Sequence, residues 1–78
     1  MNYEVIVQKV ISMFAMLADT ENEITVESEL IEDLGFSSMD VLMLICDLEE
    51  EFKIKIPEKL IRSMETIGDV VEVIESLL

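Results

Sequence analysis

Apolar residues recur at three- and four-residue intervals in three stretches of the chain, the spacing that gathers them on one face of an α-helix. The first stretch covers residues 2–17, where polar side chains fill the positions between the apolar ones. Its apolar residues are Tyr3, Ile6, Val7, Val10, Ile11, Phe14 and Leu17. We therefore predict an amphipathic helix over residues 2–17.

The second stretch, residues 38–51, predicts a helix with two apolar faces. The expected core stripe consists of Val41, Leu44, Ile45, Leu48 and Phe52. The other face consists of Met39, Leu42, Met43, Cys46 and Glu50. A small domain cannot easily bury both faces of one helix, so either the loop covers the second face or that face is exposed for a partner. We favour the partner, because methionines form adaptable contact surfaces as well as cores.

Helix-capping patterns mark the last two helices. Pro57 suits the first position of a helix, so residues 58–63 are predicted to form a short one. Thr66 is followed three residues later by Asp69, a capping-box-like start for the final helix. The buried stripe expected there is Ile67, Val70, Val71, Ile74, Leu77 and Leu78. Residues 53–56 alternate like a strand, but they have no second strand to pair with, so we predict an extended loop.

A long loop, residues 18–35, joins the first helix to the second. Several of its apolar residues are expected to pack on the helices; they are Ile24, Val26, Leu30, Ile31 and Leu34. Ser28 is expected to cap a short helical turn. The fold class is therefore all-α: a small four-helix bundle with three longer helices, one short helix and a long loop after the first. Its 78 residues are expected to form a single domain, residues 1–78.

The start of the second helix contains the candidate functional group, a serine hydroxyl. Gly35 permits a tight or left-handed turn, and Ser37 followed by Asp40 is a capping-box-like start. The helix therefore begins at Ser37 or Ser38, and the serine that does not cap it faces solvent. First-turn amides and the helix dipole favour an anion there, such as a phosphate ester. Two adjacent serines before a helix are, without further evidence, usually an N-cap residue and its neighbour, with no role beyond the cap.

Charge is unevenly distributed along the chain. There are 18 acidic and 5 basic side chains, no histidine and a formal net charge of −13. Twelve acids lie between Asp19 and Phe52, where there is no Lys or Arg, whereas four of the five cations lie between Lys53 and Arg62. Such a surface repels nucleic acid and anionic membranes, so we expect no nucleic-acid partner and no membrane insertion. A requirement for solubility explains why the net charge is large, but it explains less well why the acids and the cations occupy separate stretches of the sequence.

No set of residues typical of a catalyst occurs in the sequence. Without histidine there is no ordinary serine triad, and Cys46 has no imidazole partner. One cysteine excludes an internal disulfide and, without histidine, the usual zinc cluster. The sequence shows neither a signal-peptide pattern nor a membrane-spanning stretch. We therefore expect no enzyme, no catalytic residue and no metal site, and a reducing, cytoplasmic location.

Several motifs follow one another over nearly the whole chain. They are Ile24-Thr25-x-x-Ser28-x-Leu30, Glu32-Asp33-Leu34-Gly35-x-x-Ser38-x-Asp40, Leu48-Glu49-Glu50-Glu51-Phe52, Ile54-x-Ile56-Pro57 and Thr66-Ile67-Gly68-Asp69-Val70. In this order they resemble the acyl carrier protein family. Such a match is far more specific than a single Gly-Ser pair.

The resemblance implies that Ser38 carries a covalent 4′-phosphopantetheine arm, which a phosphopantetheinyl transferase attaches from coenzyme A. In the family the thiol of this arm holds an acyl group as a thioester and presents it to partner enzymes. The implied partners are the transferase and acyl-transferring and chain-elongating enzymes with basic docking patches, in fatty acid or related polyketide biosynthesis. We expect the chain to be a monomer.

The resemblance also places partner recognition on the second helix. The expected docking residues, an apolar centre with an acidic rim, are Met39, Asp40, Leu42, Met43, Cys46, Glu49 and Glu50. The sequence departs from the family where Ser37 replaces the usual Asp, Met39 the usual Leu and Met43 a common acid. Two alternatives are therefore kept: a carrier of an aminoacyl or specialised-metabolite unit, and an unmodified acidic interaction module with the same fold.

Overall fold

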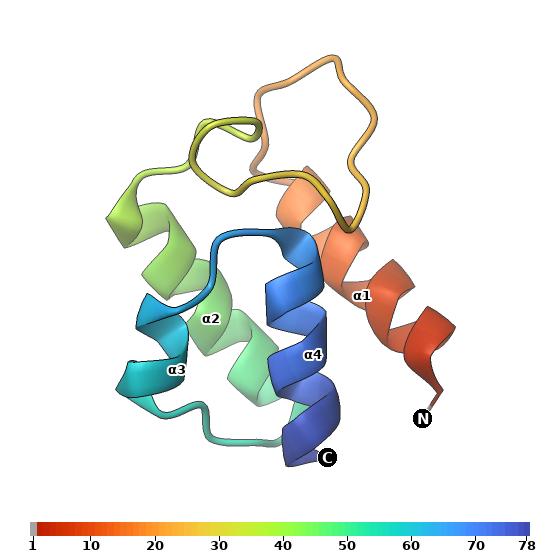
Figure 1. Cartoon of the computed structure of the whole chain (residues 1–78), viewed down its shortest axis with the longest axis vertical. Helices are drawn as coiled ribbons and strands as arrows, with labels where there is room; N and C mark the ends of the chain where they lie inside the picture. Colours follow the sequence, from red (N-terminus) through yellow and green to blue (C-terminus); the bar gives the residue numbers. More distant parts are fainter. Residues whose placement is uncertain (1) are drawn as a thin grey trace.

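The computed structural model describes residues 2–78. Within that range it contains four helices: α1 (Tyr3–Ala15), α2 (Ser38–Phe52), α3 (Glu58–Arg62) and α4 (Ile67–Leu77). Figure 1 shows α1, α2 and α4 as the long elements of a bundle, with the short α3 beside α2 and the α1–α2 loop across one end. The predicted all-α bundle is confirmed. In the described part of the chain, no helix is long and apolar enough to cross a membrane.

One continuous core joins the three long helices. Its completely buried side chains are Ile6, Val10, Phe14, Leu48, Ile67, Val70, Val71 and Ile74. Phe36, in the segment just before α2, is also buried, and its ring meets that of Phe14 edge to face with centroids 5.8 Å apart. This aromatic contact ties the start of α2 to α1.

Backbone hydrogen bonds hold the long loop on the start of α4. They join residues 26–30 to residues 65–68, and we call this pairing the clasp. The N–H groups of Leu30, Ile67 and Gly68 donate to carbonyl oxygens of the opposite segment over 2.8–3.0 Å. Glycine fits at position 68 because a Cβ there would meet a carbonyl oxygen of the loop at 3.0 Å.

Two carboxylates fix the segments that form the clasp. The Asp33 carboxylate accepts the N–H of Glu29 at 2.7 Å, and the Asp69 carboxylate accepts the N–H of Thr66 at 3.1 Å. The Thr66 hydroxyl in turn accepts the N–H of Asp69 at 3.1 Å, which confirms the capping box predicted for α4. Each segment therefore keeps its shape through local bonds.

Several apolar residues anchor the long loop, as predicted. Leu30 and Leu34 are buried and Ile24 packs against the core, whereas Ile31 is 58% exposed and does not act as an anchor. The N–H groups of Asp33 and Leu34 both donate to the carbonyl of Glu29, which closes a tight turn. Successive side chains of a tight turn point in different directions, so they cannot all reach the core.

Other predictions fail at the ends of elements. Leu17 lies beyond the end of α1 and Tyr3 lies in its first turn, so both are substantially exposed. Leu78 is likewise exposed at the end of α4. The predicted cap at Ser28 is also wrong, because its hydroxyl accepts the N–H of Thr25 at 2.9 Å and closes the turn before it.

Residues 54–57 belong to neither a helix nor a strand, so the predicted loop is confirmed. Lys53 ends α2 in a left-handed conformation, with a φ of 56°. Ile56 is buried, whereas Lys55 is exposed. The Glu49 carboxylate accepts the N–H of Ile56 at 2.7 Å, which fixes this loop against α2.

Two ion pairs occur among residues 2–78, and both are exposed. Lys9 and Glu51 join α1 to α2 at 2.8 Å, and Arg62 and Glu58 pair at 2.9 Å within α3. The hydrogen bond from the Lys9 ammonium lowers the pKa of Glu51. Exposed pairs of this kind contribute little to stability.

Leu30→Ala is expected to lower the free energy of unfolding by about 2–5 kcal/mol, because it removes a side chain that is only 2% exposed and leaves a cavity. The matched control is Ile31→Ala, one residue further on, where a side chain 58% exposed should cost about 0.5 kcal/mol or less. Urea denaturation measures both. Equal losses would show that Leu30 does not anchor the loop.

Candidate functional site

The turn before α2 depends on a glycine. Gly35 has a φ of +73°, in the left-handed region that favours glycine, and a Cβ there would meet no atom within 4 Å. Glycine is therefore required by the backbone conformation and not by lack of space. The turn leads the chain from the buried Leu34 to the buried Phe36 and then into α2.

The two serines at the start of α2 have different environments. The Ser37 hydroxyl accepts the N–H of Asp40 at 3.2 Å, and the Asp40 carboxylate accepts the N–H of Ser37 at 2.9 Å. This arrangement confirms the predicted capping box. Ser38 is the first residue of the helix and is exposed. The cap therefore occupies Ser37 and leaves the Ser38 side chain at the surface.

The helix end beside Ser38 suits a phosphate group. The N–H groups of Asp40 and Val41 donate to the hydroxyl and the carbonyl of Ser37. The helix itself supplies no acceptor for the N–H groups of Ser38 and Met39, which lie at its positive end. A phosphodiester on the Ser38 oxygen would lie next to amides that favour an anion.

A hollow of about 510 Å³ opens beside Ser38, bordered by the long loop, α2 and the α3 region. Its apolar lining residues are Leu30, Ile31, Val41, Leu42, Ile61 and Met64. Its charged lining residues are Glu29, Glu32, Glu58, Arg62 and Glu65. The volume lies within the roughly 300–1,000 Å³ typical of small-molecule sites, and the apolar lining suits an uncharged chain.

The second apolar face of α2 is exposed. The exposed fraction is 67% for Met39, 45% for Leu42 and 56% for Met43, and the free thiol of Cys46 is exposed beside them. The alternative that the long loop covers this face is therefore wrong. Glu50 is also exposed, one helical turn beyond Cys46.

Two of the acids predicted for docking have partners within the fold. Asp40 belongs to the cap of α2, and Glu49 holds the N–H of Ile56. Both carboxylates therefore stabilise the bundle, whatever they do in docking. Contact of Asp40 and Glu49 with a partner enzyme stays a prediction.

Sequence reasoning did not include Ile31 in this region. Its side chain is exposed and lines the hollow together with Leu42 of α2. The available signal was the adjacent pair of Leu30 and Ile31 within a short turn, since two neighbouring side chains there do not share one direction. Ile31 extends the apolar surface from α2 onto the long loop.

Both the sequence and the fold of this chain are similar to those of known proteins. Residues 8–74 match the family described as phosphopantetheine attachment site. The chain is 48% identical to the acyl carrier protein of Clostridium perfringens over 58 residues, which cover 74% of this chain and 76% of that protein. This chain belongs to the acyl carrier protein family. It is also 42% identical to the acyl carrier protein of Borrelia garinii subsp. bavariensis over 76 residues, 96% of this chain and 95% of that one.

A solved structure of acyl carrier protein from Enterococcus faecalis has the same fold, with a TM-score of 0.84, 29% identity and coverage of 100% of both chains. Acyl carrier proteins are carriers and not enzymes, and they hold acyl groups through covalently attached 4′-phosphopantetheine. The exposed Ser38 hydroxyl, the helix end and the hollow fit that group. Membership of the family implies a phosphopantetheinyl transferase and biosynthetic enzymes as partners.

Ser37→Ala is expected to lower the free energy of unfolding by about 1 kcal/mol, because it removes the hydroxyl that caps α2. Ser38→Ala is the matched control and should change stability by about 0.5 kcal/mol or less, since Ser38 does not form the cap. Urea denaturation of the two variants measures the difference. A larger loss for Ser38→Ala would reverse the roles of the two serines.

Proposed function

We propose that Ser38 is the attachment point of the phosphopantetheine arm. The observation that carries this proposal is the contrast between the two hydroxyls. Both serines are exposed, but only the Ser37 hydroxyl is engaged in the cap, and within residues 2–78 the Ser38 hydroxyl forms no hydrogen bond. A serine hydroxyl needs a base to act as a nucleophile, and the chain contains no histidine. The base therefore comes from the transferase. The carrier's part is to present the Ser38 hydroxyl on a fixed helix end.

The bound arm supplies a thiol that holds the acyl group as a thioester. The chain's own residues stabilise the negative charge of the arm's phosphate and cover the apolar part of the acyl group. The amides of Ser38 and Met39 favour the phosphate charge at the end of α2. The apolar side chains of the hollow, among them Val41, Leu42 and Ile61, cover apolar groups and keep water from them.

The carrier acts in fatty acid or related polyketide biosynthesis in the cytoplasm, an assignment supported by the relatives named acyl carrier protein. Its partners include the transferase and acyl-transferring and chain-elongating enzymes. The exposed face of Met39, Leu42 and Met43 supports docking on α2. In such an interface, apolar contacts set the lifetime of the complex, and exposed acids such as Glu50 set the rate at which it forms.

The wild-type chain, incubated with coenzyme A and a broad-specificity transferase, is expected to gain the mass of one phosphopantetheine. Ser37→Ala should gain it as well, whereas Ser38→Ala should gain none because the acceptor oxygen is missing. Intact-mass spectrometry measures the gain, and peptide mapping locates it. A label on Ser38→Ala, or an unlabelled wild type with several transferases, would contradict the proposal.

Leu42→Ala is expected to speed dissociation from the transferase roughly tenfold, because it truncates a side chain at the centre of the docking face. The matched control is Leu17→Ala: the exposed fractions are 45% for Leu42 and 47% for Leu17, but Leu17 lies just after α1. Surface plasmon resonance separates the two rate constants. Equal dissociation of both variants would remove Leu42 from the docking face.

A further inference from the structure

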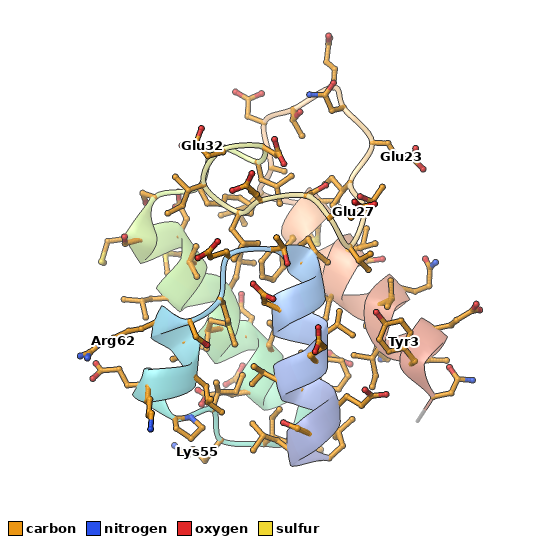
Figure 2. The ribbon with its side chains drawn as sticks, viewed as in Figure 1. Tyr3, Glu23, Glu27, Glu32, Lys55 and Arg62 are labelled. Atoms are coloured by element: carbon orange, nitrogen blue, oxygen red, sulfur yellow. The ribbon has the colours of Figure 1, made fainter. Side chains whose placement is uncertain are left out.

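Four of the five cations of this acidic chain lie along α3 and the loop that leads to it. All four are exposed, and we call them the basic strip: Lys53, Lys55, Lys59 and Arg62. Figure 2 shows Lys55 and Arg62 on the α3 side of the molecule, whereas Glu23, Glu27 and Glu32 lie on the long loop at the other end. Lys55 and Arg62 therefore lie apart from these acids of the long loop, while Glu58 of α3 lies beside Arg62.

The core holds the basic strip in place. Ile56 is buried and hydrogen-bonded through its N–H, so the adjacent Lys55 is presented outward from a fixed segment. Lys59 and Arg62 are three residues apart on α3, and the two residues between them are half-buried. The two cations consequently share the outer face of this short helix.

Stabilisation of the fold does not account for the basic strip. Arg62 pairs with Glu58, but their side chains are 76% and 75% exposed, and such a pair contributes little. Within residues 2–78, Lys53, Lys55 and Lys59 form no ion pair. Cations spread among the acids would relieve more repulsion than cations gathered at one edge.

The basic strip begins at the functional site. Arg62 lines the same hollow as Ser38, Leu42 and Ile31. An enzyme that brings its active site to Ser38 therefore lies over the Arg62 end of the strip. Lys59 and Arg62 are opposite in sign to the exposed acids along α2, such as Glu50. Glu58, which pairs with Arg62, and Glu65 border the hollow on the same side, so the positive charge that the enzyme meets there comes from individual cations among acids.

We infer that the basic strip docks an acidic surface patch on the enzymes that act at Ser38. This inference rests on the proposed function of Ser38. The occupant is a folded protein with charges of both signs, acidic opposite the basic strip and basic opposite the exposed acids of α2. A nucleic acid, an anionic membrane or a second copy of the chain would meet the repulsion of the whole molecule, whose net charge is −13.

The test compares two double variants that each make the chain more negative by two charges. Lys59→Gln with Arg62→Gln removes the end of the basic strip near Ser38, and glutamine keeps a high helix propensity. Gln8→Glu with Ser12→Glu is the matched control, on the exposed surface of α1. Surface plasmon resonance on the immobilised transferase from the same cell measures the association rate constant of each unmodified chain.

Lys59→Gln with Arg62→Gln is expected to associate about three- to tenfold more slowly at low salt, while the control is no slower than the wild type. At about 1 M NaCl, where the Debye length is about 3 Å, the difference should vanish. Lys53→Gln with Lys55→Gln, at the far end of the basic strip, should show a smaller decrease. Unchanged urea midpoints confirm that the variants fold.

Unchanged or faster association of both strip variants would overturn the inference. Two other results would overturn it if the association of Lys59→Gln with Arg62→Gln with the transferase stayed unchanged. In the first, the wild type sediments as a dimer and the variant as a monomer. In the second, the wild type binds vesicles of about 30% anionic phospholipid and the variant does not. Loading is assayed separately by intact mass. A wild type that takes up no phosphopantetheine contradicts the proposed function, whereas normal loading with unaltered association contradicts only the role of the basic strip.

Discussion

The core of this chain is large enough to bury one face of α2 and not the other. Val41, Leu44 and Leu48 are buried, while Met39 and Leu42 stay exposed on the same helix. The long loop and α3 stand beside the exposed face and not over it, and the hollow lies between them. A carrier that passes between enzymes needs such a face, because each complex must form through surface contacts and then dissociate.

The position of Ser38 depends on contacts made before α2 begins. The clasp fixes the long loop on the start of α4, and the contact of Phe36 with Phe14 fixes the last part of that loop on α1. Between them, Gly35 turns the backbone into the helix. The Ser38 hydroxyl is thus presented by a segment that two other helices hold in place.

The helices and the caps of α2 and α4 could be predicted because each rests on residues close together in sequence. Ser37 and Asp40 form the predicted box, and so do Thr66 and Asp69. The clasp could not be predicted, because it joins backbone groups far apart in the chain and carries no side-chain signature. For the same reason the hollow follows only from the tertiary arrangement.

Some of the acids of this chain have a structural role that the composition does not reveal. Four carboxylates, those of Asp33, Asp40, Glu49 and Asp69, accept backbone N–H groups over 2.7–3.1 Å. Replacing any of them leaves an N–H group without its partner and costs stability, so a slower partner reaction in such a variant would not identify a docking residue. Among residues 2–78, the carboxylate of Glu50 accepts no backbone N–H group in this way. Substitution of Glu50 therefore tests docking with the least effect on the fold.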